Sequence, residues 1–574
     1  MKNLLSLTLF CCLMAACSPG MKKGVAFPET GVTFTTSDLA LQQVFDRAET
    51  LAAANIRQYT PRYKVMVEGG EYPYVWVETQ PMGGVMYGKR DLRIAHDNVT
   101  IFLNNQLPNG RIGGKVVALN NNVWGASPLV EREDSTIGVF AETLQGYFVP
   151  PAALDLYYLL GRDEAYLDLL YNSFEAYDNY LWSTRDSDGD GCLEAWCETD
   201  AGEDHLTRFR YSPFFWPFDY PPTPENIPND TVFFKQYGIK YDLEGFAIEK
   251  IPVPMESIDM MCFSYTGRDA LAVISALKGN GKEAYWRQKA DEVRQRMLDY
   301  LWVPEKNAYF FRDKNNSFIE SLTHNNLRAM YFGTMMQPMA DAFVREHLLN
   351  PDEFWTPMPL PSIAANDPYF QNIPQNNWSG QPEGLTYQRA IRALENYGHL
   401  AEVTLIGQKL LAQIQKSGIY TQQFDPFTGE QNGLDGYGPT ILSTLEYISR
   451  LYGVHLHRDE VHFNGIAAEA PYTYTQKWGD KTFALSQSEG KLTGSLNGKT
   501  LFECTAGVRV TTDLDGAILA ITGITDKPVN LTLLAEGKEY SAVVYPNEQL
   551  AVEVGNLASV KRVPFDYPYQ KQPL

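Results

Sequence analysis

The chain has 574 residues, and its 48 basic and 69 acidic side chains give a formal net charge of −21. This balance argues against a nucleic acid partner, because binding a polyanion requires cationic surface that displaces counterions. Neutral or cationic ligands fit better. Hydrophobic residues make up 44% of the chain and aromatic residues 13%, which is ample for the core of a large globular protein with about two to four domains.

The N-terminus resembles a bacterial lipoprotein signal. A basic start precedes an apolar run over residues 4–13, and Met14-Ala15-Ala16-Cys17 follows as a small-residue cleavage site. The resemblance implies a signal over residues 1–17, lipidation of Cys17 and a tether over residues 18–36. The apolar run is too short to span a bilayer. No acidic run of the kind that marks surface export follows Cys17, so we expect the lipid-anchored protein to face the periplasm from the outer membrane. We also expect it to be a monomer.

Residues 37–453 are expected to form a mainly α domain, because their apolar residues recur at helical spacing. Three stretches, 150–182, 268–302 and 387–415, each predict a helical hairpin, with turns at Gly161, Gly279–Gly281 and Gly398. A polar, turn-rich segment follows each hairpin, at 187–191, 304–307 and 425–429. Such recurrence favours an α/α toroid, which buries the ends that an open solenoid must cap.

Residues 454–574 are expected to form a small β-sandwich. Their segments alternate between apolar and polar residues, and Asn497-Gly498 predicts a hairpin turn.

The acidic segment that follows the first hairpin offers a candidate proton donor. Asp204 lies among Glu198, Asp200 and Glu203, and Trp196 is near in sequence. Crowding by like charges favours the protonated form of a carboxyl group, which suits a general acid. The alternative is a solvated acidic loop, which is the commoner reason for such a cluster.

Residues 202–208, Gly-Glu-Asp-His-Leu-Thr-Arg, are similar to the catalytic-acid motif of the trehalase and family 63 glycoside hydrolases, Gly-x-Asp-x-x-Ser/Thr-Arg. Further matching pieces are Tyr74-Val75-Trp76, Pro108-Asn109-Gly110-Arg111, Asn-Trp-Ser-Gly at 377–380 and Asp-Pro-x-Thr-Gly at 425–429. The likeness covers most of residues 60–450. It implies an (α/α)6 six-hairpin barrel, an α-linked substrate and Asp204 as the general acid.

One position departs from the family. The family carries a glutamate base three residues before the aspartate of Asp-Pro-x-Thr-Gly, where this chain has Gln422. An inverting hydrolase needs two carboxyl groups about 6.5–9.5 Å apart. Glu383 is our first candidate for the base, with Glu430 and Asp435 as alternatives. Glu383 could equally be a carboxylate that interacts with a helix N-terminus.

The candidate sugar-binding residues combine aromatic faces with amides, carboxylates and guanidinium groups, which suit the two sides of a pyranose ring. They are Trp76, Glu78, Gln80, Arg90, Asn109, Arg208, Asp259, Trp378 and Gln422. Several of them have a structural alternative. Residues 74–90 could form an ordinary buried junction, Arg208 and Asn109 could orient a neighbouring carboxylate, and Asp259 could cap a helix.

No cysteine and histidine spacing of the zinc type occurs, so we expect no transition metal. Asp186, Asp188 and Asp190 have the spacing of a calcium loop, with Glu194 as a further donor. Position twelve is Cys197, which excludes an EF-hand. A structural calcium ion and a plain Asp/Gly turn both remain open.

The leading hypothesis is an exo-acting, inverting glycoside hydrolase that trims a small neutral glucosyl or mannosyl glycan, with Asp204 as acid and Glu383 as base. The alternatives are a non-hydrolytic glycan-binding lipoprotein and a phosphorylase or lyase on the same scaffold. Gln422 is compatible with a binding protein and with a phosphorylase, because neither needs a base to activate water.

Overall fold

Six helices form a closed inner ring, in which each packs against the next and the last packs back against the first. They are α2 (Gln80–Tyr87), α4 (Val149–Leu159), α7 (Ile258–Lys278), α9 (Asn325–Phe332), α11 (Gly384–Glu395) and α13 (Gly438–Tyr452). The computed structural model describes residues 27–119, 129–131, 136–209, 212–223, 226, 251–374, 376–553 and 556–569. The signal and Cys17 lie outside these residues.

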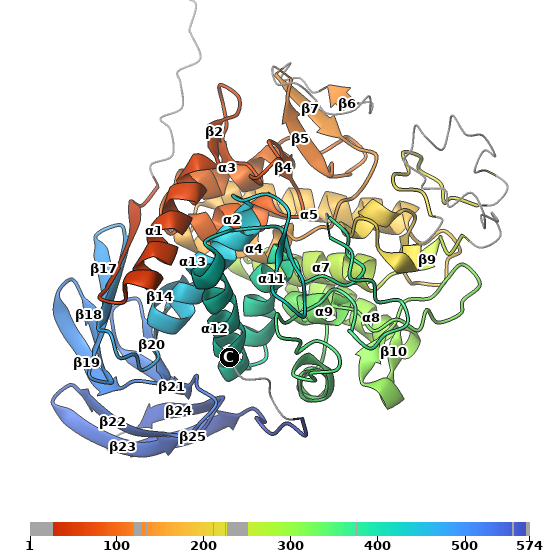
Figure 1. The fold of residues 1–574 in the computed structure, drawn as a ribbon. Coiled ribbons are helices and arrows are strands. Elements are labelled where there is room, and N and C mark those ends of the chain that lie inside the picture. The colour runs from red at the N-terminus through yellow and green to blue at the C-terminus, as the bar shows by residue number, and fades with distance from the viewer. Residues whose placement is uncertain are drawn as a thin grey trace, which may run out of the picture.

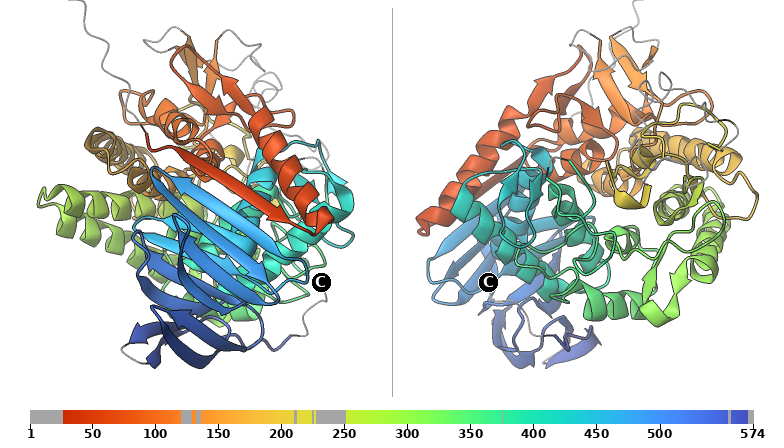
Figure 2. Two further views of the ribbon diagram at one scale, coloured as in Figure 1. Left: turned by 90° about the vertical axis from the view of Figure 1, so that its left-hand side faces the viewer. Right: turned by 45° about the vertical axis from the view of Figure 1, so that its right-hand side comes forward.

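A second layer of helices surrounds the ring (Figures 1 and 2). It contains α1 (Leu39–Ala54), α3 (Leu92–Leu103), α5 (Glu164–Thr184), α8 (Glu283–Tyr300), α10 (Gln337–Phe343) and α12 (Leu400–Ser417). The burial patterns explain the two layers. Helix α8 buries only Trp286, Ala290, Val293 and Met297, a single stripe at spacings of three and four. Helix α13 is buried from Gly438 to Leu451. The domain is therefore an (α/α)6 toroid, as expected.

The three predicted hairpins are confirmed as α4–α5, α7–α8 and α11–α12. Gly161, Gly279 and Gly398 all have positive φ angles, between 60° and 82°. Glycine adopts this backbone region without the steric penalty that a side chain imposes, so it ends each first helix sharply.

Short strands also lie within the α domain, of which only the segment around Val75 and Trp76 was expected from the sequence. The sheet β4-β5-β7-β6 contains β4 (Val75–Trp76), β5 (Lys115–Ala118), β7 (Ile137–Phe140) and β6 (Leu129–Glu131). Two-stranded pairs are β2 (Ile56–Gln58) with β3 (Lys64–Met66), β8 (Glu194–Ala195) with β9 (Met255–Glu256), β10 (Trp302–Val303) with β11 (Ala308–Tyr309), and β12 (Gln423–Phe424) with β13 (Gln431–Asn432). Strands of two to four residues are too short to show an alternating pattern.

The C-terminal region is strand-rich, as expected, and forms two antiparallel sheets. One has the order β14-β15-β20-β21-β24-β25, with β14 (Gly453–His457), β15 (Glu460–Gly465), β20 (Val508–Asp513), β21 (Ile518–Gly523), β24 (Glu548–Glu553) and β25 (Asn556–Arg562). The other, β1-β16-β17-β18-β19-β22-β23, contains β16 (Tyr472–Trp478), β17 (Lys481–Ser488), β18 (Lys491–Leu496), β19 (Lys499–Thr505), β22 (Val529–Ala535) and β23 (Lys538–Val544). Asn497 and Gly498 form the predicted turn between β18 and β19, with φ angles of 51° and 78°.

Part of the expected tether is a strand of this domain. Strand β1 (Thr30–Thr36) pairs antiparallel with β16 over its whole length. Figure 2 (left) shows this N-terminal strand alongside the blue strands of the C-terminal domain. The expectation of a tether over residues 18–36 is therefore wrong for 30–36. The strand before α1 also links the N-terminus of the barrel to the β domain.

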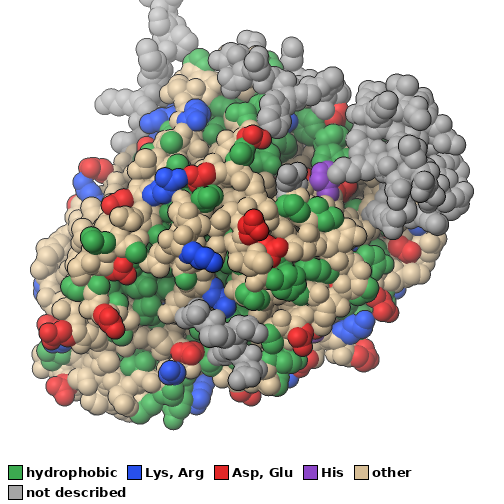
Figure 3. All heavy atoms as spheres, viewed as in Figure 1, with side chains coloured by type: hydrophobic (Ala, Val, Ile, Leu, Met, Phe, Trp, Pro, Cys, Tyr) green, Lys and Arg blue, Asp and Glu red, His purple; other side chains and the backbone are tan. Residues whose placement is uncertain are grey.

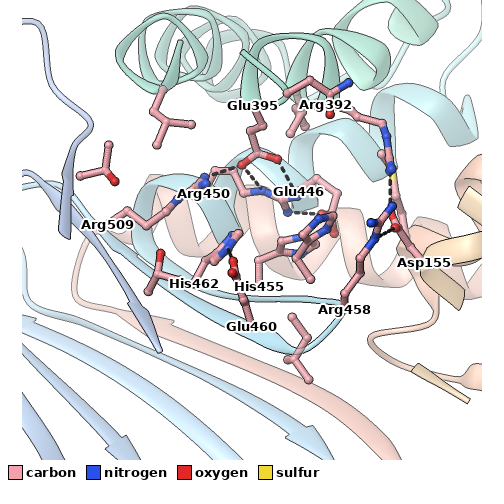
Figure 4. A pocket seen from close by; sticks show the side chains of 18 of the residues that line it. Asp155, Arg392, Glu395, Glu446, Arg450, His455, Arg458, Glu460, His462 and Arg509 are labelled. Carbon is pink, nitrogen blue, oxygen red and sulfur yellow. Dashed lines mark hydrogen bonds and ion pairs between the residues drawn. The ribbon is translucent and has the colours of Figure 1, made fainter. Parts of the chain in front are cut away.

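Ion pairs line a cavity of about 520 Å³ between the toroid and the β domain (Figure 4). Glu395 on α11 pairs with Arg450 on α13 and with Arg509 on β20. Asp155 on α4 pairs with Arg392 at 2.5 Å and with Arg458 at 3.2 Å. Because Arg458 and Arg509 belong to the β domain, these pairs join the two domains.

Acidic and basic side chains are interspersed on the face shown in Figure 3, where no large basic patch is visible among the described residues. Among the helices that the structure describes, none combines the length and the apolar character needed to cross a membrane.

Candidate active site

A cavity of about 390 Å³ opens among segments of the barrel domain that are far apart in the sequence. Three carboxylates line it, Glu68, Glu78 and Asp204. The remaining lining residues are aromatic, amide, cationic or small: Tyr72, Tyr74, Trp76, Lys115, Phe140, Gln145, Thr199, Gly202, Phe214, Phe215, Asn376, Trp378, Leu385, Gln422 and Tyr437. The volume lies within the usual range of small-ligand pockets.

Asp204 is half-buried at the cavity wall, and the segment 376–379 holds its loop in place. The Asn376 side chain donates from Nδ2 to Asp204 Oδ2 at 2.7 Å, and the Trp378 backbone N–H donates to the Asp204 carbonyl at 3.0 Å. The Ser379 hydroxyl accepts from the Thr207 backbone at 3.1 Å and donates to the His205 carbonyl at 2.9 Å. Residues 376–379 therefore fix the loop that carries the candidate acid.

Glu68 and Glu78 are the other two cavity carboxyls, and both have raised pKa values. Burial raises the pKa of Glu68 to about 8, with a further increase from the charge of Glu78. Tyr437 donates to Glu68 Oε1 at 2.9 Å, which partly offsets that shift. Burial also raises the pKa of Glu78, to about 7, although Arg389 lowers it and donates to its Oε1 at 2.7 Å. Glu78 is thus held by a guanidinium group, and Glu68 by a phenol.

Aromatic rings and one lysine form part of the wall. The Lys115 ammonium lies 4.8 Å from the ring centroid of Tyr74, 4.6 Å from that of Trp76 and 4.7 Å from that of Phe140. Burial lowers the pKa of Lys115 to about 8. The Trp76 indole Nε1 is buried and makes no hydrogen bond within the described structure. These rings offer apolar faces to a ligand in the cavity, and the indole offers a hydrogen-bond donor.

Gln422 lines the cavity as expected. Its Oε1 accepts a hydrogen bond from the Tyr72 hydroxyl at 3.0 Å, and its Nε2 donates to Asn376 Oδ1 at 2.9 Å. Since Asn376 also binds Asp204, Gln422 and the candidate acid are joined through one side chain. The position at which the family places its base is therefore inside the site, and it holds an amide.

Glu383 lies behind the cavity wall, close enough for its charge to interact with those of Glu78 and Asp204. Its side chain is completely buried and is not among the residues that line the cavity. Its backbone forms a bridge with Gln423, directly before α11, and its side chain does not cap that helix. Burial, reinforced by the charge of Glu78, raises its pKa well above the usual range. Because Glu383 does not line the cavity, the geometry favours one of the cavity carboxyl groups as the base instead.

Arg208 and Asp259 belong to a buried ionic network beside the cavity, with no exposed side-chain surface. Arg208 pairs with Glu203, and Asp259 lies 3.3 Å from Arg328. Asn325 donates from one amide to both Glu203 and Asp259. Although burial alone would raise the pKa of Glu203, Arg208 and Arg328 hold it well below the usual range. The predicted binding residues Arg208 and Asp259 therefore contact protein groups and orient the residue that precedes Asp204.

Three other predicted binding residues do not line the cavity. Gln80 is buried and accepts from the Trp76 backbone N–H at 2.7 Å, so it binds the main chain of β4 instead. Arg90 pairs with Glu49 at 2.5 Å. Asn109 is exposed, and its side chain accepts from the Arg111 backbone at 3.2 Å within a turn. Of the predicted residues, the structure brings together Asp204, Trp76, Glu78, Trp378 and Gln422.

Sequence reasoning missed Glu68, Tyr72, Lys115, Asn376 and Tyr437. One signal for Glu68 was present, because Gly69-Gly70 follows it. Both glycines have positive φ angles, and a Cβ at Gly69 would lie 2.5 Å from the Gly436 carbonyl. The glycine thus allows the Glu68 loop to approach the loop that carries Tyr437.

Comparison with solved structures supports the fold. The family 63 mannosylglycerate hydrolase from Thermus thermophilus, solved with glucose, is 18% identical, with 71% of this chain and 100% of that chain covered and a TM-score of 0.55. The same enzyme with Tris and D-glycerate gives 16% identity, 71% and 100% coverage, and a TM-score of 0.54. A protein named sialidase gives 12% identity, covers 86% of this chain and 43% of its own, and has a TM-score of 0.61.

The sequence itself matches a family over residues 73–440, which is more than half of the chain and includes Trp76, Glu78, Asp204, Trp378 and Gln422. That family is described as the mannosylglycerate hydrolase MGH1-like glycoside hydrolase domain. The chain therefore belongs to the mannosylglycerate hydrolase MGH1-like family of glycoside hydrolases.

Proposed function

We propose that this glycoside hydrolase is exo-acting and inverting, and that it removes an α-linked glucosyl or mannosyl unit from a small glycan or glycoside. The observation that carries the proposal is the presence of Asp204 and two further carboxyl groups, Glu68 and Glu78, in one aromatic-lined cavity. The modest cavity volume suits the end of a glycan rather than the middle of a long chain. The α-linkage and the type of sugar follow from the family resemblance.

Asp204 is assigned as the general acid. Its carboxyl group protonates the glycosidic oxygen as the bond from that oxygen to the anomeric carbon breaks. Asn376 holds one of its oxygens, and the Trp378 backbone holds its main chain. This support fixes the direction in which the carboxyl group faces the cavity.

Glu68 is assigned as the general base, in place of Glu383. A water molecule forms the new bond to the anomeric carbon from the opposite face and gives a proton to the Glu68 carboxylate. Glu68 suits this role better than Glu78, because Arg389 and Arg328 draw Glu78 into an ionic network. Tyr437 binds Glu68 and packs edge-on against Tyr72, which in turn binds Gln422. Glu68 is thus linked to the position where the family carries its base.

The test is a screen of protein lacking residues 1–17 against α-linked gluco- and manno-disaccharides and small α-glycosides. Asp204→Asn and Glu68→Gln are each expected to lower kcat by a factor of about 10²–10⁴. Their matched controls, Asp526→Asn and Glu71→Gln, change exposed carboxylates that do not line the cavity and should keep full activity. Full activity in Asp204→Asn would refute the assignment of the acid.

The same screen separates the alternatives. Sugar phosphate that forms only when inorganic phosphate is present would identify a phosphorylase, with Lys115 as the cation at the cavity wall. Sugar binding without turnover across the panel would identify a binding protein.

We also propose that the protein is a monomer anchored by lipid on Cys17 in the outer membrane and facing the periplasm. The signal-like residues 1–17 support the anchor. Cys17→Ala is expected to move the protein from the membrane fraction to the soluble fraction. Digestion by protease added to whole cells would contradict the periplasmic orientation, and size-exclusion chromatography with light scattering tests the monomer.

A further inference from the structure

Five carboxylates gather outside the active-site cavity, directly after helix α5. Asp186, Asp188 and Asp190 lie in the loop that follows this helix, Glu194 lies on β8, and Glu256 lies on β9. Oxygens of the three aspartates all lie within 4.8 Å of one another, and so do oxygens of Asp188, Glu194 and Glu256. Asp188 belongs to both groups, so the five side chains form one cluster.

Two buried glutamates face each other in this cluster. Glu194 and Glu256 are directly opposite in the antiparallel pair β8–β9, and they are 2% and 5% exposed. Like charges at opposite positions destabilise a strand pair, and burial increases the repulsion. Among the described residues, a single cationic group forms an ion pair with the five carboxylates.

The hydrogen bonds leave one buried oxygen without a partner. Glu194 accepts from the Ser187 hydroxyl at 2.7 Å and from the Trp196 indole at 2.6 Å. Glu256 Oε2, in contrast, accepts no hydrogen bond from the described residues. Arg296 pairs with Asp190 at 2.9 Å, where both side chains are partly exposed. A buried carboxylate oxygen that faces other carboxylates and lacks a donor indicates a missing cation.

We propose that Asp186, Asp188, Asp190, Glu194 and Glu256 bind a calcium ion. Calcium accepts six to eight oxygen ligands in flexible geometry, and carboxylates are its preferred protein ligands. Magnesium is smaller and requires near-octahedral geometry, which a crowded set of five carboxylates suits less well. The site differs from an EF-hand, because Cys197 occupies position twelve and Glu256 closes the site from a strand about sixty residues later in the chain.

The ion would join two segments that lead to the active site. Strand β8 continues through Trp196 into the segment that carries Asp204, and β9 continues into α7, which carries Asp259. These segments also meet through the Glu194–Glu256 strand pair. The inference does not rest on the proposed reaction, because the ligands lie outside the cavity.

The test uses the chain from residue 18 onward, treated with EGTA and dialysed, and then titrated with CaCl2 or MgCl2. We expect one calcium ion per chain by isothermal titration calorimetry, and a rise in Tm of at least about 2 °C at saturation. Magnesium should give a smaller rise. A Tm that calcium does not change would overturn the proposal.

The decisive variant is Glu256→Gln, which keeps the shape of the side chain and removes its charge. We expect it to lose the calcium-induced rise in Tm, while its Tm in EGTA equals or exceeds that of the wild type because the repulsion with Glu194 is relieved. Asp188→Asn, at an exposed position, serves as a second variant if Glu256→Gln does not fold. Glu469→Gln, an exposed glutamate of the β domain, should keep the full rise. A full rise in both Glu256→Gln and Asp188→Asn would refute the site.

Discussion

Asn376 donates a hydrogen bond from its Nδ2 to Asp204 Oδ2 at 2.7 Å. The opposite atom of the same amide, Oδ1, accepts from Gln422 at 2.9 Å. One side chain therefore orients the candidate acid. The same side chain also binds the amide of Gln422, the residue at the position of the family's base. Asp204, the proposed acid, is therefore held by a hydrogen bond at the cavity wall, whereas the position of the family's base holds an amide.

Replacement of Asn376 tests this support. Asn376→Ala removes the hydrogen bond to Asp204 and is expected to lower kcat about tenfold, because the carboxyl group loses its orientation. The KM should change less than kcat. Asn372→Ala, which removes an exposed asparagine that binds Asp425, is the matched control and should keep the wild-type kcat. A wild-type kcat in Asn376→Ala would show that Asp204 needs no such support.

A restored glutamate tests the assignment of Glu68 as base. Gln422→Glu places a carboxyl group at the family's usual position within the same cavity. We expect Glu68→Gln to lose activity and the double variant Glu68→Gln/Gln422→Glu to regain at least about tenfold, as measured by initial rates of sugar release. No recovery, together with an active Glu68→Gln single variant, would show that another group activates the water.

The pH dependence of kcat/KM gives an independent test. Glu68 must be deprotonated to act as base, and burial raises its pKa to about 8. Activity should therefore rise as the pH increases towards 8. Tyr437→Phe removes a hydrogen bond that lowers this pKa, so the rising limb should move to higher pH. A limb that stays in place in Tyr437→Phe would argue that a different group controls it.

The buried network makes a prediction about stability. Arg208→Leu leaves Glu203 and Asp259 with less compensation for their charge and should lower the free energy of unfolding by about 3–5 kcal/mol. Arg345→Leu, which breaks an exposed pair with Glu346, should change it by less than about 1 kcal/mol. Urea denaturation measures both. Equal values for the two variants would mean that Arg208 faces solvent or substrate rather than the network.

Acid should destabilise the protein through buried neutral histidines. Burial lowers the pKa of His462 to about 4 and that of His324 to about 3. Because the unfolded chain binds these protons at higher pH, the stabilisation from the neutral histidines is complete above about pH 6.5. It is lost as the pH falls to the pKa values of the folded state. For His462 the free energy of unfolding falls by about 3 kcal/mol. Urea unfolding of His462→Gln should show a weaker dependence on pH between about 6.5 and 4, and an unchanged dependence would contradict this account.

The sequence predicted the toroid well, because its evidence is local and repeated. Each hairpin carries its own apolar spacing and a glycine at the turn, as Gly161 and Gly398 show. The strand β1 was missed because its partner, β16, lies more than four hundred residues away and no local pattern reveals it. The motif around Asp204 led to a loop that lines the cavity, but it could not show which polar residues of that loop face the cavity.

The errors in the site share one cause. A basic or polar residue within a motif can bind either a ligand or a carboxylate of the protein itself. Only the fold shows which of the two it contacts. Arg208 pairs with Glu203, and Arg90 pairs with Glu49, a residue of α1 that no motif includes. Glu68 lies outside every quoted motif and reaches the cavity because Gly69 allows a close approach of two loops.

The configuration of the first-formed sugar tests the central claim most directly. Proton NMR recorded within the first minutes of hydrolysis, on an α-glycoside that the enzyme turns over, distinguishes the two anomers before mutarotation mixes them. Asp204 and Glu68 acting in a single displacement predict that the β-anomer of the released sugar appears first and that Asp204→Asn abolishes its formation. Initial release of the α-anomer would contradict the account, because it requires a covalent intermediate and a retaining mechanism.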